Sequence, residues 1–196
     1  MERNERKVGV LLTYLNIFLN TAVMLFFTPV LIAYLGKNEF GLYSLAMTIL
    51  TYLALLDFGF GNAVVVFTSK YQTKKLYLRQ KALYGSIFVI YLGISACATL
   101  LLYYFHSNVD YLFSSSMSIH EVEILKSIIF ILSINIILSV PFNLFKSILT
   151  AYERFVFLKL TSVVRTVVTP LFLLYAIQME LNVVDIVLII SVVNLL

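Results

Sequence analysis

Residues 8–36, VGVLLTYLNIFLNTAVMLFFTPVLIAYLG, contain no charged side chain and decide the class of this protein. About 20 apolar residues suffice for a helix to cross the ~30 Å hydrocarbon core of a bilayer, so this stretch is long enough to cross with some tilt. A cleaved secretory signal is the alternative, but its apolar region would extend over only about 7 to 15 residues and end at a small-residue cleavage site. We therefore expect an uncleaved membrane anchor.

The composition of the whole chain points the same way. Hydrophobic residues make up 61% of the 196 residues and charged residues 12%, against roughly 45 to 50% and about 25% in soluble globular proteins. A chain so rich in Leu, Ile, Val and Phe has no solvation reason to stay disordered in water. Cys97 is the single cysteine, which excludes a disulfide framework. The composition argues against a water-soluble, a disordered and a disulfide-stapled protein.

Further apolar stretches follow the first along the chain. We expect helical spans at residues 8–35, 40–67, 82–105, 127–149 and 155–177, and a sixth at 183–196. Strands of a membrane barrel would need about ten residues of strict alternation, whereas these stretches contain continuous apolar runs. In lipid, a single crossing satisfies its own backbone groups only as a helix. The sequence thus predicts an all-α fold, a polytopic transmembrane helix bundle.

The sixth stretch is shorter than a crossing. Only 14 residues remain from Val183 to Leu196, and no cap, turn or charged flank closes them. We expect five complete spans plus a truncated sixth, in either a fragment or a truncated gene product.

The charges gather in short islands, as in a membrane protein, and not on one basic face, as in a nucleic-acid-binding domain. The formal net charge is +4, from 14 Lys and Arg less 10 Asp and Glu. Connections on the side of the N-terminus carry eleven basic residues: Arg3, Arg6, Lys7, Lys70, Lys74, Lys75, Arg79, Lys81, Lys146, Arg154 and Lys159. The opposite side carries two, Lys37 and Lys126. Because basic residues tend to stay in the cytoplasm, we expect a cytoplasmic N-terminus.

Arg165 is the most informative polar residue, because it falls almost midway along the span 155–177. Such a charge costs roughly 2.5 to 3.5 kcal/mol on insertion scales, so it needs a partner, water or a ligand. Thr161, Ser162 and Thr169 extend its polar stripe at helical spacing. We interpret Arg165 as a cation in a wet central cavity that binds a phosphate or another anion. A structural ion pair, with Asp57 as the candidate partner, is the alternative.

Asparagines form similar stripes on two other spans. Asn16 and Asn20 are four residues apart, and so are Asn135, Ser139 and Asn143 in turn. One interpretation is a bundle around a watery, substrate-binding cavity. The other is that amide and small side chains hold helices together in lipid.

Asp57 and several helix breakers lie inside the expected spans. Asp57 has three candidate roles: it accepts a proton or cation during transport, pairs with an arginine, or caps a break in its helix. Gly59 and Gly61 favour a bend or a close helix contact. Pro141 and Pro170 each remove a backbone donor within a span, and transporters use interrupted helices around midplane sites.

Signals of catalysis are weak. His106, His120, Glu121 and Glu123 share an external loop, but the two glutamates are two residues apart and do not share a helical face. No metal-ligand spacing, nucleophile elbow or phosphate loop occurs. We expect no catalytic residues, no metal and no cofactor.

A family resemblance emerges from short motifs in the first eighty residues and one later. The motifs are Pro29, Tyr34-Leu35-Gly36, Glu39-Phe40-Gly41-Leu42-Tyr43, Leu55-Leu56-Asp57-Phe58-Gly59-Phe60-Gly61-Asn62-Ala63, Lys70-Tyr71 and Ala151-Tyr152-Glu153-Arg154-Phe155. They resemble the polysaccharide biosynthesis proteins, which are lipid-linked oligosaccharide flippases of the multidrug/oligosaccharidyl-lipid/polysaccharide exporter superfamily.

The resemblance implies 12 to 14 spans in two six-helix lobes, of which residues 1–196 would be the N-terminal lobe. It implies transport of undecaprenyl-pyrophosphate-linked repeat units across the bacterial inner membrane by alternating access, for O-antigen or capsule synthesis, with Arg165 near the pyrophosphate. The implied partners are the lipid-linked oligosaccharide, membrane lipids, the missing C-terminal lobe and other membrane proteins of polysaccharide assembly, with no nucleic acid. The alternatives are a multidrug or lipid-II exporter, a membrane-embedded glycan polymerase or transferase, and a nonfunctional remnant.

Overall fold

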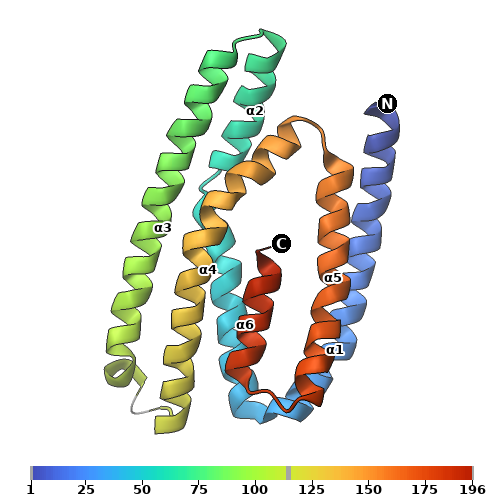
Figure 1. The fold of residues 1–196 in the computed structure, drawn as a ribbon. Helices are drawn as coiled ribbons and strands as arrows, with labels where there is room; N and C mark the ends of the chain where they lie inside the picture. Colours follow the sequence, from blue (N-terminus) through green and yellow to red (C-terminus); the bar gives the residue numbers. More distant parts are fainter. Residues whose placement is uncertain (1, 114–115, 196) are drawn as a thin grey trace.

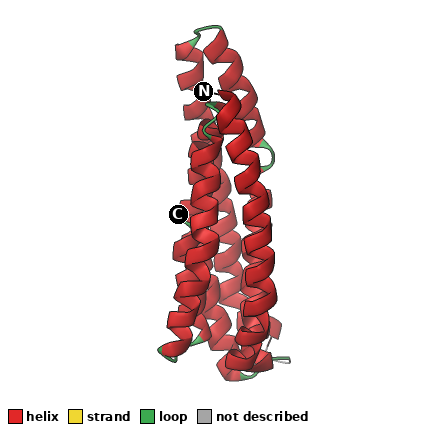
Figure 2. Ribbon diagram, turned by 90° about the vertical axis from the view of Figure 1, so that its right-hand side faces the viewer, coloured by secondary structure: helices red, strands yellow, loops and turns green. Residues whose placement is uncertain are grey.

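The computed structural model describes residues 2–113 and 116–195, with side chains from Val8 onward except those of residues 53 and 54. The described chain is 91% helical and contains no strand, which confirms the all-α prediction. Its elements are α1 (Glu2–Leu53), a short 3-10 helix η1 (Ala54–Asp57), α2 (Phe60–Thr73), α3 (Tyr77–Phe113), α4 (Ile119–Ala151), α5 (Phe155–Gln178) and α6 (Val183–Asn194). They align along one long axis, with most connections at its two ends (Figures 1 and 2).

Four stretches of the described chain are long and apolar enough to cross a membrane: Val8–Thr73, Tyr77–Phe113, Ile119–Ala151 and Phe155–Gln178. The last three contain the predicted spans 82–105, 127–149 and 155–177, and α3 and α4 extend beyond the predicted limits at both ends. α6 has 12 residues and is shorter than a crossing. Residue 196, which closes the predicted sixth span, lies outside the described residues.

The first of these stretches contains two predicted spans, 8–35 and 40–67, and bends between them. Gly36 adopts φ 73° and ψ 175° inside α1, so the helix changes direction there. The chain descends along α5, turns at the lower end and rises again beside α4 (Figure 1). A φ of this sign strains any residue with a Cβ, which explains a glycine at the bend.

The predicted span 40–67 is broken at residues 57–59, as the interpretation of Asp57 as a cap and of Gly59 and Gly61 as a bend predicts. α1 ends at Leu53, η1 occupies Ala54–Asp57, and α2 begins only at Phe60. Between them Phe58 and Gly59 take positive φ angles of 47° and 81°. Hydropathy alone does not detect such a break, because the residues on both sides are equally apolar.

Three helices end in the same hydrogen-bonded turn, in which a left-handed residue follows the cap and two backbone N–H groups bond back to the last turn. After α2, Lys75 N donates to Gln72 O at 3.0 Å and Leu76 N to Tyr71 O at 2.8 Å. The corresponding left-handed residues after α4 and α5 are Glu153 and Glu180, with φ 57° and 54°. Glycine is usual at this position, and here charged residues occupy it.

The connection before α4 is closed by side chains. Ser118 caps α4: its Oγ accepts from the Glu121 N–H at 3.3 Å, and its own N–H donates to Glu121 Oε2 at 2.7 Å. This backbone N–H, with the Ser118 hydroxyl, holds the pKa of Glu121 below its ordinary range. The reciprocal pair is a capping box, which satisfies N–H groups that the helix leaves free.

Buried apolar side chains form three clusters around α4 and α6. The first joins α1, α3, α4 and α6 through Ala46, Leu125 and Val187, among others. The second joins α2, α3 and α4, and the third joins α1, α5 and α6. Large apolar side chains also cover the outside of α1, where Phe18 is 70% and Phe26 77% exposed. A surface of this kind is suited to lipid.

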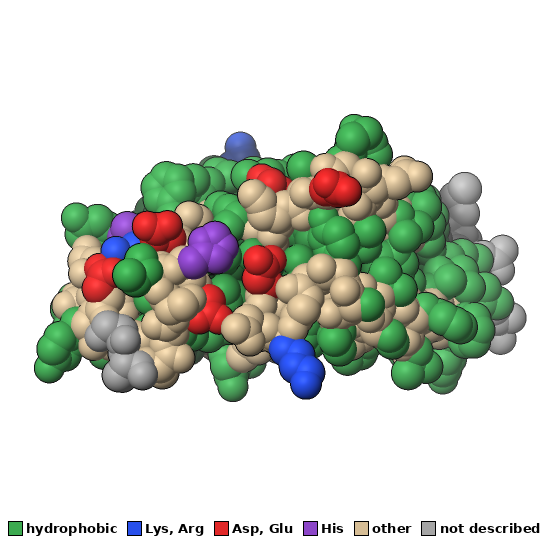
Figure 3. Space-filling model, turned by 90° about the horizontal axis from the view of Figure 1, so that it is seen from below, with side chains coloured by type: hydrophobic (Ala, Val, Ile, Leu, Met, Phe, Trp, Pro, Cys, Tyr) green, Lys and Arg blue, Asp and Glu red, His purple; other side chains and the backbone are tan. Residues whose placement is uncertain are grey.

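The two ends of the bundle differ in charge. The N-terminus, the α2–α3 connection and the α4–α5 connection lie at one end in Figure 1, and eleven of the Lys and Arg residues belong to these segments or the helix ends beside them. The side chains of Arg3, Arg6 and Lys7 are outside the described residues. Figure 3 shows the opposite end, where carboxylates gather with histidine. The alternation predicted from hydropathy therefore agrees with the three-dimensional arrangement.

Candidate anion-binding groove

The candidate site is a groove of about 830 Å³ between α4 and α5, lined also by Asn194 and Leu195. Its cations are Lys146, Lys159 and Arg165, and none of the described residues that line it is acidic. The rest of the lining combines polar and apolar side chains: Ser139, Phe142, Asn143, Phe145, Leu149, Thr150, Phe155, Phe157, Leu158, Thr161, Ser162, Asn194 and Leu195. The groove is thus cationic and amphipathic.

The groove exists because α4 and α5 diverge from their tight connection. α6 lies between them toward the lower end (Figure 1), and its residues Asn194 and Leu195 also line the groove. In Figure 1 the upper part of α4 leans toward the start of α5, so the two helices lie farther apart below their connection. Pro141 lies inside α4 and Pro170 inside α5, where each removes one backbone donor and favours bending. Both prolines are buried.

Arg165 lies in this groove and is not paired with Asp57. Its Nη1 donates to the backbone oxygen of Asn194, near the C-terminal end of α6, at 3.4 Å. A backbone carbonyl carries no net charge, so the contact orients the guanidinium without neutralising it. The side chain remains exposed to the groove. Its remaining N–H donors are available to a ligand.

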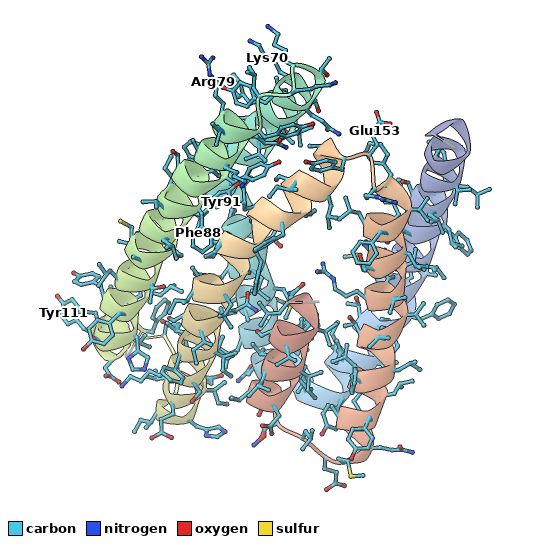
Figure 4. The ribbon with its side chains drawn as sticks, turned by 45° about the horizontal axis from the view of Figure 1, so that its top comes forward. Lys70, Arg79, Phe88, Tyr91, Tyr111 and Glu153 are labelled. Atoms are coloured by element: carbon cyan, nitrogen blue, oxygen red, sulfur yellow. The ribbon has the colours of Figure 1, made fainter. Side chains whose placement is uncertain are left out.

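Asp57 caps the helix break, which was one of its three candidate roles. Both carboxylate oxygens accept from the Gly61 N–H, at 3.2 and 3.1 Å, and the Tyr91 hydroxyl donates to the same carboxylate. Tyr91 reaches it from α3 (Figure 4). Gly61 itself is closely packed, because a Cβ there would lie 2.8 Å from Ser147 Oγ of α4. Gly59, at φ 81°, supplies the left-handed residue before α2.

Two predicted binding asparagines instead connect helices. Asn16 of α1 donates through Nδ2 to Ser162 Oγ of α5, and its Oδ1 accepts from Thr166 Oγ1 at 3.2 Å. Asn135, 4% exposed in α4, donates to the Ser191 backbone oxygen of α6 at 2.8 Å. Both amides therefore follow the alternative interpretation, in which they hold helices together.

The remaining two asparagines lie in different places. Asn143 lines the groove with Arg165, as the cavity interpretation predicts. Asn20 lines a separate, smaller depression of about 430 Å³ on α1, together with Thr28 and Pro29. Of the predicted substrate-binding residues, the structure thus brings together Arg165 and Asn143, and leaves Asn16, Asn20 and Asn135 outside the groove.

Lys146 and Lys159 were not predicted as binding residues, because they were assigned to the basic flank of the membrane. A usable signal was present in the spacing. Lys159, Ser162 and Arg165 are separated by three residues each, and Lys146 follows Asn143 by three, so each set shares one helical face. The aromatic lining carries no comparable signal, since phenylalanines occur on all faces of these helices.

Among the described residues, no group of three or more His, Cys, Asp and Glu side chains is arranged to hold a metal ion. Comparisons of the chain with protein-family models, with curated proteins and with solved structures gave no match.

Proposed function

We propose that this chain is one lobe of a bacterial inner-membrane flippase, which moves undecaprenyl-pyrophosphate-linked oligosaccharide repeat units from the cytoplasmic to the outer leaflet for surface polysaccharide synthesis. The observation that carries the proposal is the set of three cations, Lys146, Lys159 and Arg165, around one groove whose described lining has no carboxylate. Cations near hydrocarbon are costly unless an anion or water compensates them, so their convergence favours an anionic ligand.

The remaining lining suits the other parts of such a ligand. Asn143, Ser139 and Thr161 offer hydrogen bonds of the kind that sugar hydroxyls make, while Phe142 and Phe157 offer apolar surface to the polyprenyl chain. A volume of about 830 Å³ is within the roughly 300 to 1,000 Å³ of small-molecule sites. A headgroup would be held in the groove while its lipid chain remains in the bilayer.

The orientation proposed is N-terminus in the cytoplasm, because the basic end of the bundle would then face the cytoplasm. The groove lies toward this end, where the substrate is made. Alternating access needs a second body against which this lobe rocks, so a second six-helix lobe is the required partner. No bond of the substrate is broken, and the protein acts as a carrier without enzymatic activity.

Other transport substrates fit the groove less well. An exporter of cationic drugs requires acidic groups in its cavity, and the described lining has cations instead. A lipid-II exporter would use the same diphosphate chemistry and differs only in the sugar. A glycan polymerase requires acids or histidines gathered in large external loops, whereas the connections around residues 114–118 and 179–182 are short.

A binding measurement tests the proposal. The chain in lipid nanodiscs is titrated with a polyprenyl diphosphate, with the corresponding monophosphate and with the neutral polyprenol of equal length. We expect affinity to fall in that order, because each lost phosphate removes charge from contact with the cations. Equal affinity for the alcohol and the diphosphate would refute recognition of the anion.

A further inference from the structure

A second concentration of positive charge lies outside the groove, at the tip of the α2–α3 hairpin. Five basic residues occur within twelve positions, and no Asp or Glu occurs between Phe58 and Val109. All five are exposed: Lys70, Lys74, Lys75, Arg79 and Lys81. In Figure 4 the labelled Lys70 and Arg79 extend from the tip, away from the bundle. We call this surface the basic tip.

The backbone of the basic tip is ordered by hydrogen bonds. The turn at Lys75 closes α2, and Gln80, 5% exposed, donates through Nε2 to the Tyr84 hydroxyl at 2.7 Å and to the Tyr152 hydroxyl at 2.9 Å. Tyr152 follows α4, so this amide ties the start of α3 to the α4–α5 turn. The cations are therefore presented on a fixed frame and do not belong to a loose connection.

Exposed apolar side chains accompany these cations. Leu78 is 83% and Tyr77 59% exposed, in the first turn of α3. Free phosphate or a nucleic-acid backbone would not compensate an exposed leucine, whereas a lipid surface takes both the cations and the apolar groups. Tyrosine is also enriched where the bilayer meets water.

The length of α3 places the basic tip at the correct depth. Its 37 residues extend over about 55 Å at 1.5 Å per residue, against ~30 Å of hydrocarbon and about 40 to 45 Å with the headgroups. The ends of α3 therefore reach the headgroup region or beyond it. Lys81 is the last charge before the uncharged stretch 82–105, so the tip begins at the border of the hydrocarbon.

We propose that the basic tip is a binding site for anionic phospholipids, in which its Lys and Arg side chains contact headgroup phosphates and Leu78 and Tyr77 insert between the lipids. This inference rests on the membrane setting of the proposed function but is independent of the transported substrate. Cations near an anionic leaflet each contribute appreciably to binding, by roughly fivefold in affinity per residue. The site would hold the hairpin against the leaflet while the lobe moves.

The chain contains no tryptophan, so one introduced tryptophan reports on its surroundings without background. Leu78→Trp is placed in nanodiscs of zwitterionic phosphatidylcholine, with or without anionic phosphatidylglycerol. We expect its emission to shift to shorter wavelengths, and its quenching by brominated lipid to rise, when the anionic lipid is added. A triple variant that combines Lys74→Gln, Lys75→Gln and Arg79→Gln should lower the affinity for the anionic lipid, as read from this response, about a hundredfold.

Two controls separate the possible failures. Lys37→Gln with Lys126→Gln, at the opposite end, should leave the Leu78→Trp response intact. Val89 of α3 is 67% exposed, so the fluorescence of Val89→Trp should be quenched by brominated lipid in both lipid compositions. If Val89→Trp is not quenched, the membrane setting itself fails. Soluble polyglutamate serves as a polyanion without lipid. If Val89→Trp is quenched but the emission of Leu78→Trp does not respond to the anionic lipid, or responds equally to polyglutamate, the lipid assignment is overturned. The proposed transport function would still stand.

Discussion

The contact between α2 and α4 at Gly61 predicts that a single methyl group will weaken the fold. In Gly61→Ala the new Cβ would lie 2.8 Å from Ser147 Oγ and 3.1 to 3.2 Å from the two Asp57 carboxylate oxygens. Overpacking of this kind costs about 1 to 3 kcal/mol. Alanine returns about 0.5 to 1 kcal/mol of helix propensity, so we expect a net loss of up to about 2.5 kcal/mol.

A matched control comes from α3. Gly93 is a helical glycine with open space around its Cβ position, so Gly93→Ala should gain up to about 1 kcal/mol. The free energy of unfolding is measured for both variants in mixed micelles by far-ultraviolet circular dichroism during titration with a denaturing detergent. Ser147→Ala should restore part of the stability of Gly61→Ala. Equal stability of the two alanine variants would refute the close packing of α2 on α4.

Three further predictions concern local structure. Tyr91→Phe should cost about 1.5 to 3 kcal/mol of unfolding free energy, because it removes the hydroxyl donor to Asp57 and keeps the ring; an unchanged value would exclude that bond. Glu180→Gly should stabilise by about 1 kcal/mol, since glycine tolerates φ 54°, whereas Glu180→Ala should not. The pKa of Glu121 is lowered in the folded state. Its contribution to the stability of the α4 cap is therefore present above the unfolded-state pKa and is lost as the pH falls through the folded-state pKa. The protection of amides in the first turn of α4, taken as the intrinsic exchange rate at each pH divided by the observed rate, should therefore fall in acid below the ordinary glutamate value of 4.5, and a Ser118→Ala variant should show little of this pH dependence.

Hydropathy predicts the helices of this fold because each of α3, α4 and α5 contains an apolar stretch long enough to cross a membrane. The positions of α3, α4 and α5 therefore follow from predominantly apolar runs of sequence. The ends do not, since α3 and α4 extend into regions where charged residues continue the helix. The break between α1 and α2 also escapes hydropathy, although Asp57 followed by Gly59 is a local signal for a cap and a left-handed residue.

The site was predictable only in part, because helical spacing says which residues share a face but not what that face meets. Arg165 was identified from the cost of its charge, and Asn143 from its stripe. Asn135 belongs to the same stripe as Asn143, yet Asn135 donates to the backbone of α6, whereas Asn143 lines the groove. Which neighbouring helix each amide faces is a property of tertiary structure, and it separates an amide that connects helices from an amide that lines a groove.

The central claim is that Arg165 binds a diphosphate in a groove that it shares with Lys146 and Lys159. The most direct test is the affinity of the nanodisc-embedded chain for a polyprenyl diphosphate in three variants: Arg165→Gln, Arg165→Lys and the distant control Lys126→Gln. A hydrogen bond to a charged group is worth about 1.5 to 3 kcal/mol, so Arg165→Gln should weaken binding by roughly 10- to 100-fold. Arg165→Lys should retain part of the affinity, and Lys126→Gln all of it. Binding of the diphosphate by Arg165→Gln at the unsubstituted affinity would contradict the account.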